Sequence, residues 1–361
     1  MNKSDKILVV SHFSTNPEIY TYASSFVGAL RTLGHDVATF NTKAVCLPGL
    51  TSVAYHKLPS ILRLINNRIC NEQLIAAVEQ LQPDILFFIK AESITPKTLT
   101  DIKKLCNPMT ISFYPDNPFT FWNGNANSNT LTALPRFEHV LSWSHMLKPA
   151  LQSAGARMVH YFPFGYDAAL FNQPIAISDQ DQQKYAADVC FVGTWEAERE
   201  QQLTELVRHN PSLDLALWGN LWALNVSDQS PLKPYIRGSA ICGSEMIKAF
   251  RCSKIVLNFI RQQNMTSHNM RTIEVPASNA FLLTERTYEQ AELLFQEDVH
   301  LACFGSTQEL REKIAFYLKE DSLRRAITAQ GHSHVQQFSL SRQLEQLFDI
   351  IKSKLSHKES L

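Results

Sequence analysis

The sequence lacks several features that mark large classes of protein. Lys plus Arg and Asp plus Glu number 34 each, so the chain carries no net formal charge. Proteins that bind nucleic acid need a basic excess to displace counterions, and we therefore expect no nucleic-acid partner. No apolar run approaches the roughly 20 residues that cross a bilayer. The first such run, within MNKSDKILVV, is far shorter than a signal-peptide core, which predicts a cytoplasmic protein.

Familiar metal, disulfide and nucleotide signatures are also missing. The seven cysteines are odd in number and include no Cys-x-x-Cys pair, so we expect free thiols in a reducing compartment. No Cys/His group has the spacing of a zinc site, and we expect no metal. The chain has neither Gly-x-Gly-x-x-Gly nor Gly-x-x-x-x-Gly-Lys-Ser/Thr, which excludes the best-known dinucleotide and P-loop motifs.

Strand-like apolar runs alternate with helical patterns through most of the 361 residues, enough chain for two domains. The first series predicts strands at 6–10, 36–40, 84–89, 109–114 and 139–143, and helices at 18–33, 70–81, 95–105 and up to about 154. The second predicts strands at 188–192, 213–218, 255–260 and 281–284, and helices at 196–209, 244–251 and 271–278. This alternation is typical of parallel strands with right-handed helical crossovers, so we predict an α/β protein of two doubly wound domains.

The alternation loosens at about 163–187, where prolines and a polar run replace it. We interpret this stretch as a linker. The predicted domains are therefore residues 1–170 and 171–340. Residues 341–361 form a C-terminal helix whose apolar stripe has to be buried against one of the domains.

Two candidate catalytic residues follow strands of the first domain. Ligands of open parallel sheets bind beyond the carboxyl ends of the strands, where His12 and Asp116 both lie. His12 is either a general base or hydroxyl ligand, because its charge changes near neutral pH, or a loop histidine without a role. Asp116, in a turn between prolines, either accepts an acceptor hydroxyl proton or only forms an Asx turn.

The second domain holds candidate ligands for an anion and for sugar hydroxyls. The Gly193-Thr194 turn ends a strand and opens a helix, where exposed backbone amides favour phosphate. A polar loop leads through Asn269 into a short helix that carries Arg271 and Glu274 on one face. These two residues either bind a diphosphate and a ribose, respectively, or form an ordinary surface ion pair.

The sequence resembles the CgeB-type, spore maturation protein-like glycosyltransferases. The resemblance is strongest over roughly 188–340 and weaker, though collinear, over 1–170. In the second domain it rests on DVCFVGT at 188–194 with Arg199 downstream, RTIEVPA at 271–277, FLLT at 281–284 and FGSTQEL at 304–310. In the first it rests on DNP at 116–118 and FGYD at 164–167 with Phe171 downstream.

The resemblance implies a GT-B fold, in which two Rossmann-like domains face a central cleft, and a nucleotide-sugar donor without a metal or other cofactor. It implies a ribose contact for Glu274, which matches the second glutamate of the wider group's Glu-x7-Glu motif. The first position is Thr266, so the anomeric outcome stays open. Arg199 is implied as a phosphate contact, and the final helix is expected to cross back onto the first domain.

The leading hypothesis is transfer of a sugar to a glycan, lipid-linked or protein acceptor. The alternatives are a nucleotide-sugar epimerase or hydrolase of the same fold, and a non-catalytic nucleotide-sugar-binding protein. Residues 56–68 combine basic and apolar side chains. They predict either a peripheral contact with the inner membrane surface or a buried amphipathic helix of the first domain.

Overall fold

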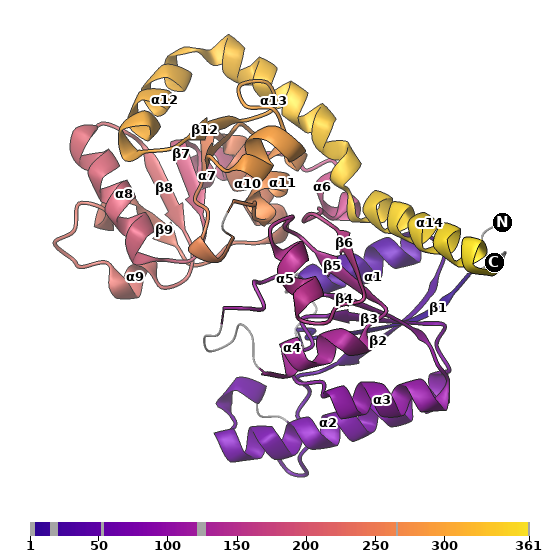
Figure 1. Ribbon diagram of the computed structural model, residues 1–361. Helices are drawn as coiled ribbons and strands as arrows, with labels where there is room; N and C mark the ends of the chain where they lie inside the picture. Colours follow the sequence, from indigo (N-terminus) through magenta and orange to yellow (C-terminus); the bar gives the residue numbers. More distant parts are fainter. Residues whose placement is uncertain (1–3, 15–20, 52–53, 121–127, 265, 360–361) are drawn as a thin grey trace. The chain divides into compact units, whose positions relative to one another are not determined.

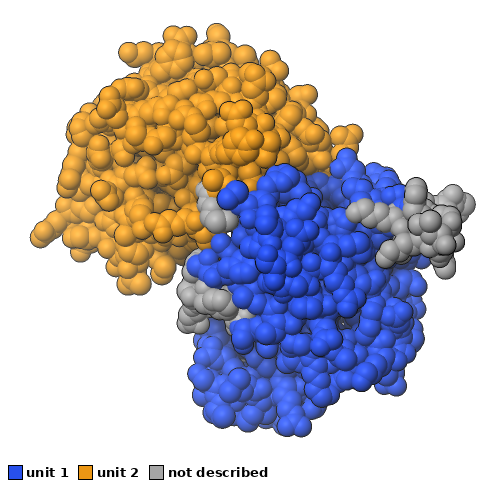
Figure 2. Space-filling model, viewed as in Figure 1, with its two compact units in different colours: residues 1–163, 343–361 blue, residues 164–342 orange. Residues whose placement is uncertain are grey.

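The chain forms two compact units in its computed structural model (Figure 2). Residues 1–163 and 343–361 make up unit 1, and residues 164–342 make up unit 2. The structure describes residues 4–14, 21–51, 54–120, 128–264 and 266–359, with side chains to residue 353 in the last helix. No helix in these ranges is long and apolar enough to cross a membrane.

Unit 1 is built on a six-stranded parallel sheet in the order β2-β1-β3-β4-β5-β6. Its central strand β3 reads ILFFI and is buried along its whole length, as expected of a parallel strand covered on both faces. The strands are β1 (Lys6–Ser11), β2 (Asp36–Asn41), β3 (Ile85–Ile89), β4 (Met109–Phe113), β5 (His139–Ser142) and β6 (Met158–Tyr161).

Helices connect these strands (Figure 1). They are α1 (Tyr22–Thr32), α2 (Ser60–Leu81), α3 (Pro96–Leu105), α4 (Ser128–Ala133) and α5 (Leu147–Ser153). Thr95 caps α3 by accepting from the backbone N–H of Thr98, and Pro96 follows it in the first turn. The last helix, α14 (Leu340–Glu359), belongs to unit 1 from Gln343 onward, and there its Phe348 ring lies 5.3 Å from the His35 ring.

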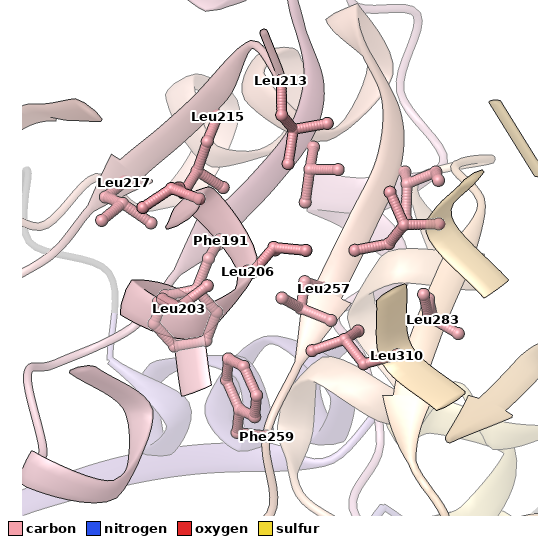
Figure 3. Packing of buried hydrophobic residues seen from close by; sticks show 14 of the residues in the cluster. Phe191, Leu203, Leu206, Leu213, Leu215, Leu217, Leu257, Phe259, Leu283 and Leu310 are labelled. Atoms are coloured by element: carbon pink, nitrogen blue, oxygen red, sulfur yellow. The ribbon is translucent and has the colours of Figure 1, made fainter. Parts of the chain in front are cut away.

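Unit 2 repeats the architecture with the strand order β12-β11-β10-β7-β8-β9. Apolar side chains of β7, β10 and β11 pack against those of α8 and α12 (Figure 3). The strands contribute Phe191, Leu257 and Leu283, and the helices contribute Leu203 and Leu310. The strands are β7 (Ala187–Val192), β8 (Leu215–Trp218), β9 (Ile236–Gly238), β10 (Ser253–Asn258), β11 (Leu282–Glu285) and β12 (Ala302–Phe304). The helices are α6 (Ala168–Phe171), α7 (Asp179–Tyr185), α8 (Ala197–His209), α9 (Trp222–Asn225), α10 (Gly243–Cys252), α11 (Met270–Ala277), α12 (Thr307–Lys319) and α13 (Asp321–Val335).

Two sequence-based interpretations are wrong in detail. The stretch 163–187 is not a plain linker, because it contains α6 and α7 and lies almost wholly in unit 2. Its polar run makes a capping box between Ser178 and Asp181, and Lys248 of α10 binds the Asp181 carboxylate at 3.0 Å. The helix predicted at 70–81 begins ten residues earlier, at Ser60. The predicted start of the helix at 18–33 lies partly outside the described residues.

Candidate active site

Two glycines allow the loops after β7 and β8 of unit 2 to pack against each other. A Cβ atom on Gly219, whose φ is +157°, would lie 1.9 Å from the carbonyl oxygen of Gly193. One on Gly193 would lie 2.7 Å from the Phe191 ring. The Gly193 N–H donates to the Trp218 carbonyl at 2.9 Å. Gly193 therefore serves the approach of two strand ends, and its own amide is already engaged.

Arg199, in the first turns of α8, is folded back over this turn. Its Nη1 donates to the Thr194 carbonyl at 2.7 Å, and its guanidinium lies 5.5 Å from the centre of the Phe191 ring. Its Nε lies 3.2 Å from the Glu196 carboxylate, in a direction that makes no hydrogen bond. Burial lowers the pKa of Arg199 to about 10, and Glu196 opposes that shift. A buried cation of this kind gains from a bound anion.

Asn269 fixes the start of α11. Its side chain accepts from the Thr272 N–H at 3.3 Å and donates to Asn258, the last residue of β10, at 3.0 Å. Asn258 in turn donates to the Thr284 hydroxyl on β11 at 3.0 Å. A chain of amides thus ties the amino end of α11 to two strand ends, so Asn269 positions this helix whatever else it contacts.

Arg271 and Glu274 form an ion pair one turn apart on α11. The Glu274 side chain is only 4% exposed and that of Arg271 is 26% exposed, so the pair is not an ordinary surface salt bridge. Arg271 Nε also donates to the carbonyl of Val192, at the end of β7, across 3.2 Å. The structure therefore places Arg271 where β7 ends and α11 begins.

Arg261, Glu285 and the Glu196 already described, none of which the sequence analysis singled out, complete this group. Arg261, just beyond β10, lies 2.5 Å from the Glu196 carboxylate through its Nε. Glu285 ends β11 and accepts from the Ile260 N–H at 2.7 Å. Arg261 and Arg271 are both near enough to lower the pKa of Arg199, after the larger effects of burial and Glu196. Their positions at or shortly after the carboxyl ends of strands were the signal that could have found them.

The residues predicted in unit 1 also lie at the carboxyl ends of strands. Asp116 follows β4, and its carboxylate binds the ammonium of Lys90 at 2.5 Å. Lys90 comes directly after β3 with φ at +47°, a strained conformation for a residue with a side chain. The next residue, Asn117, makes an Asx-type bond, in which its side chain accepts from the Phe119 N–H at 3.0 Å.

His12 follows β1 in the same unit. Burial lowers the pKa of His12 and the Lys43 ammonium lowers it further, while a hydrogen bond with Asn41 and the Glu92 carboxylate oppose this. Lys90 contributes a smaller effect in the same direction as Lys43, so His12 lies in the field of the cation that holds Asp116. The imidazole is therefore neutral near pH 7 and able to accept a proton.

Comparison with known proteins finds one matching family model and several solved structures of similar architecture. Residues 199–349 match a family model described as glycosyl transferase-like. Sucrose-phosphate synthase from Thermosynechococcus elongatus is similar in structure, with a TM-score of 0.69 and 12% identity, over 97% of this chain and 100% of that one. Among curated protein sequences, the chain has no match.

Two further solved structures have the same fold. The HepE protein of Anabaena, in complex with UDP and glucose, has a TM-score of 0.62 and 14% identity, over 96% of this chain and 100% of that one. The α,α-trehalose 6-phosphate synthase from Burkholderia multivorans has a TM-score of 0.63 and 12% identity, over 99% and 98%. The two-unit α/β architecture is the GT-B fold, as the sequence predicted. With the family match over residues 199–349, the chain is a glycosyltransferase.

Proposed function

We propose that this glycosyltransferase transfers a sugar from a nucleotide-sugar donor to an acceptor hydroxyl without a metal ion. The acceptor oxygen attacks the anomeric carbon, the bond from that carbon to the diphosphate oxygen breaks, and the nucleoside diphosphate leaves. The observation that carries the proposal is the cluster of Arg199, Arg261 and Arg271 at the carboxyl ends of the unit 2 strands. These cations supply the fixed positive charge that a departing diphosphate needs.

In this proposal Arg271 binds the diphosphate of the donor and Glu274 binds its ribose. A guanidinium has five N–H donors, and the contacts of Arg271 with Val192 and Glu274 use two of them. Phosphate oxygens take further donors, while Glu274 exchanges part of its ion pair for two ribose hydroxyls. The match of Glu274 to the second, ribose-binding glutamate of the wider group's Glu-x7-Glu motif supports the same assignment.

In unit 1 we assign the acceptor proton to His12. Its neutral imidazole suits a general base, and burial together with Lys43 favours that form. Asp116, paired with Lys90, is assigned to orient the acceptor hydroxyl. The HepE structure holds UDP and glucose, which supports a uridine nucleotide as the first donor to test. A TarM structure from S. aureus holds a glycosylated glycerol and UDP, which supports a hydroxyl acceptor of the glycan type.

A panel of nucleotide sugars tests the proposal directly. A donor that binds only the folded protein raises its melting temperature. At a donor concentration of about 100 times Kd, the free energy of unfolding rises by about 2.7 kcal/mol. Turnover of that donor is then followed with and without candidate acceptors. Transfer that needs the acceptor supports the proposal. Donor cleavage or epimerisation without acceptor would identify the epimerase or hydrolase alternative, and binding without turnover would identify the non-catalytic one.

A further inference from the structure

The first half of α2 in unit 1 holds three large aliphatic side chains in solvent. Ile61 is 65% exposed, Leu64 is 66% exposed and Ile65 is 45% exposed. Their spacing of three and four residues places them on one face of the helix. Of the two possibilities that the sequence left open for residues 56–68, the buried amphipathic helix is therefore wrong for these three residues.

Polar bonds of two buried asparagines hold α2 in this orientation. The buried Asn66 side chain accepts from the Cys46 N–H at 2.7 Å and donates to the Ala44 carbonyl at 2.9 Å. One turn later the buried Asn71 side chain accepts from the Thr95 N–H at 3.0 Å. Rolling the helix to bury Ile61 and Leu64 would break these buried bonds, which is costly. The apolar face is thus fixed outward.

Basic residues predominate around this face, and the acid next to it, Glu72, forms a surface ion pair with Arg68 at 3.2 Å. An exposed pair of this kind contributes little and can exchange its partner. From residue 37 to residue 71 the sequence has no Asp or Glu, but it has Lys43, Lys57, Arg63, Arg68 and His56. Arg68 follows Leu64 and Ile65 on the same face of α2, and its side chain is 84% exposed. Lys57, in the short turn before α2, is exposed as well. Cations beside an exposed aliphatic face are the two components of binding to an anionic bilayer surface.

We propose that the first half of α2 lies on an anionic lipid bilayer, with Ile61, Leu64 and Ile65 inserted at the headgroup boundary and Lys57 and Arg68 on the lipid phosphates. A second copy of this chain is a poorer occupant. A two-fold contact of this face with itself would bring together two surfaces on which basic residues predominate. The proposal does not depend on the donor chemistry, and it fits an acceptor that is itself held in a membrane.

Vesicle flotation tests the surface. The full-length protein is mixed with vesicles of phosphatidylcholine alone or with phosphatidylglycerol added. We expect it to float with the anionic vesicles and to lose binding as salt rises. The triple variant Ile61→Gln/Leu64→Gln/Ile65→Gln should bind about tenfold less. The matched control is Leu224→Gln, which changes a leucine that is 79% exposed in unit 2 and should float as the wild type does.

The charge component has its own pair of variants. Lys57→Gln/Arg68→Gln should lower binding to anionic vesicles severalfold and leave binding to phosphatidylcholine vesicles unchanged, whereas Arg325→Gln, at an exposed arginine of unit 2, should have no effect. Melting temperatures equal to wild type show that the variants are folded.

The proposal is overturned if the wild type does not float, or if the triple variant floats equally well. It is also overturned if the wild type sediments as a dimer and the triple variant sediments as a monomer, because the face would then be a self-association surface. Failure of the donor assay leaves these outcomes unchanged.

Discussion

Arg271 contacts two neighbours: it forms an ion pair with Glu274 and donates a hydrogen bond to the Val192 carbonyl at the end of β7. We expect Arg271→Lys to keep the positive charge but to lose the planar fork that serves both. If the guanidinium also stabilises the leaving diphosphate, kcat falls by about 10²–10³-fold. Donor turnover and melting temperature, measured on the same preparation, check this. Unchanged turnover with a lowered melting temperature would leave Arg271 a structural role only.

Arg271→Ala is the less informative variant. It leaves the buried Glu274 carboxylate without its partner, which costs about 3–5 kcal/mol of stability, given that Glu274 is almost fully buried. A loss of activity in that variant would therefore mix unfolding with chemistry. The lysine variant separates the two.

For Glu274→Gln we expect weaker donor binding by about 1.5–3 kcal/mol, because a charged acceptor for two ribose hydroxyls becomes a neutral one. Calorimetric titration with the donor found in the nucleotide-sugar panel measures this. Glu205→Gln, at a glutamate of α8 outside the arginine cluster, is the control and should bind donor normally. Normal binding by Glu274→Gln would contradict the ribose assignment.

His268 gives unit 2 a pH dependence. It is fully buried, accepts from the Phe164 N–H at 3.0 Å, and burial lowers its pKa to about 3. In the unfolded chain His268 takes up a proton near pH 6.5, whereas in the folded protein it stays neutral down to about pH 3. Its contribution to the free energy of unfolding is therefore fully present above pH 6.5 and is lost as the pH falls toward 3. The loss is about 1.4 kcal/mol per pH unit for one proton.

The matched variant is His268→Gln, which keeps an acceptor for Phe164 but does not titrate. Denaturant unfolding at pH 7 and pH 5 compares the two proteins. We expect the wild type to lose more stability than the variant over this interval. Equal losses would show that His268 does not carry the dependence.

At the scale of elements, α11 is positioned by its cap. We expect Asn269→Ala to cost about 1 kcal/mol of stability and also to weaken donor binding, because the side chain ties α11 to the end of β10. Ser306→Ala removes the cap of α12, where Ser306 accepts from the Glu309 N–H. The two variants should match in melting temperature and differ in donor affinity. Equal donor affinity would restrict Asn269 to a cap.

At the scale of the whole molecule, the last helix closes unit 1. Phe348 of α14 is buried beside His35. Phe348→Ala should therefore cost about 3–5 kcal/mol. Ile350→Ala, on the exposed side of the same helix, should cost little. Denaturant unfolding measures both. A small effect of Phe348→Ala would mean that α14 contributes little to the stability of unit 1.

The sequence by itself determined the alternation of strands and helices and which candidate residues lie at the carboxyl ends of strands. Period and capping are local, so β3, α3 and β7 could be predicted from runs of a few residues. The polar run of α7 was misread because a surface helix without an apolar stripe resembles a loop until α10 holds it through Lys248 and Asp181. Candidate residues directly after strands were found for the same local reason.

Only the tertiary structure decided which of those residues meet. Arg271 reaches Val192 across 79 residues because β10 and β7 are neighbours in the sheet, and strand order has no local signature. Lys90 joins Asp116 because β3 and β4 pair, and Arg261 joins Glu196 because β10 and β7 end together. Burial, which distinguishes the Arg271–Glu274 pair from an ordinary surface contact, is likewise a property of packing rather than of spacing.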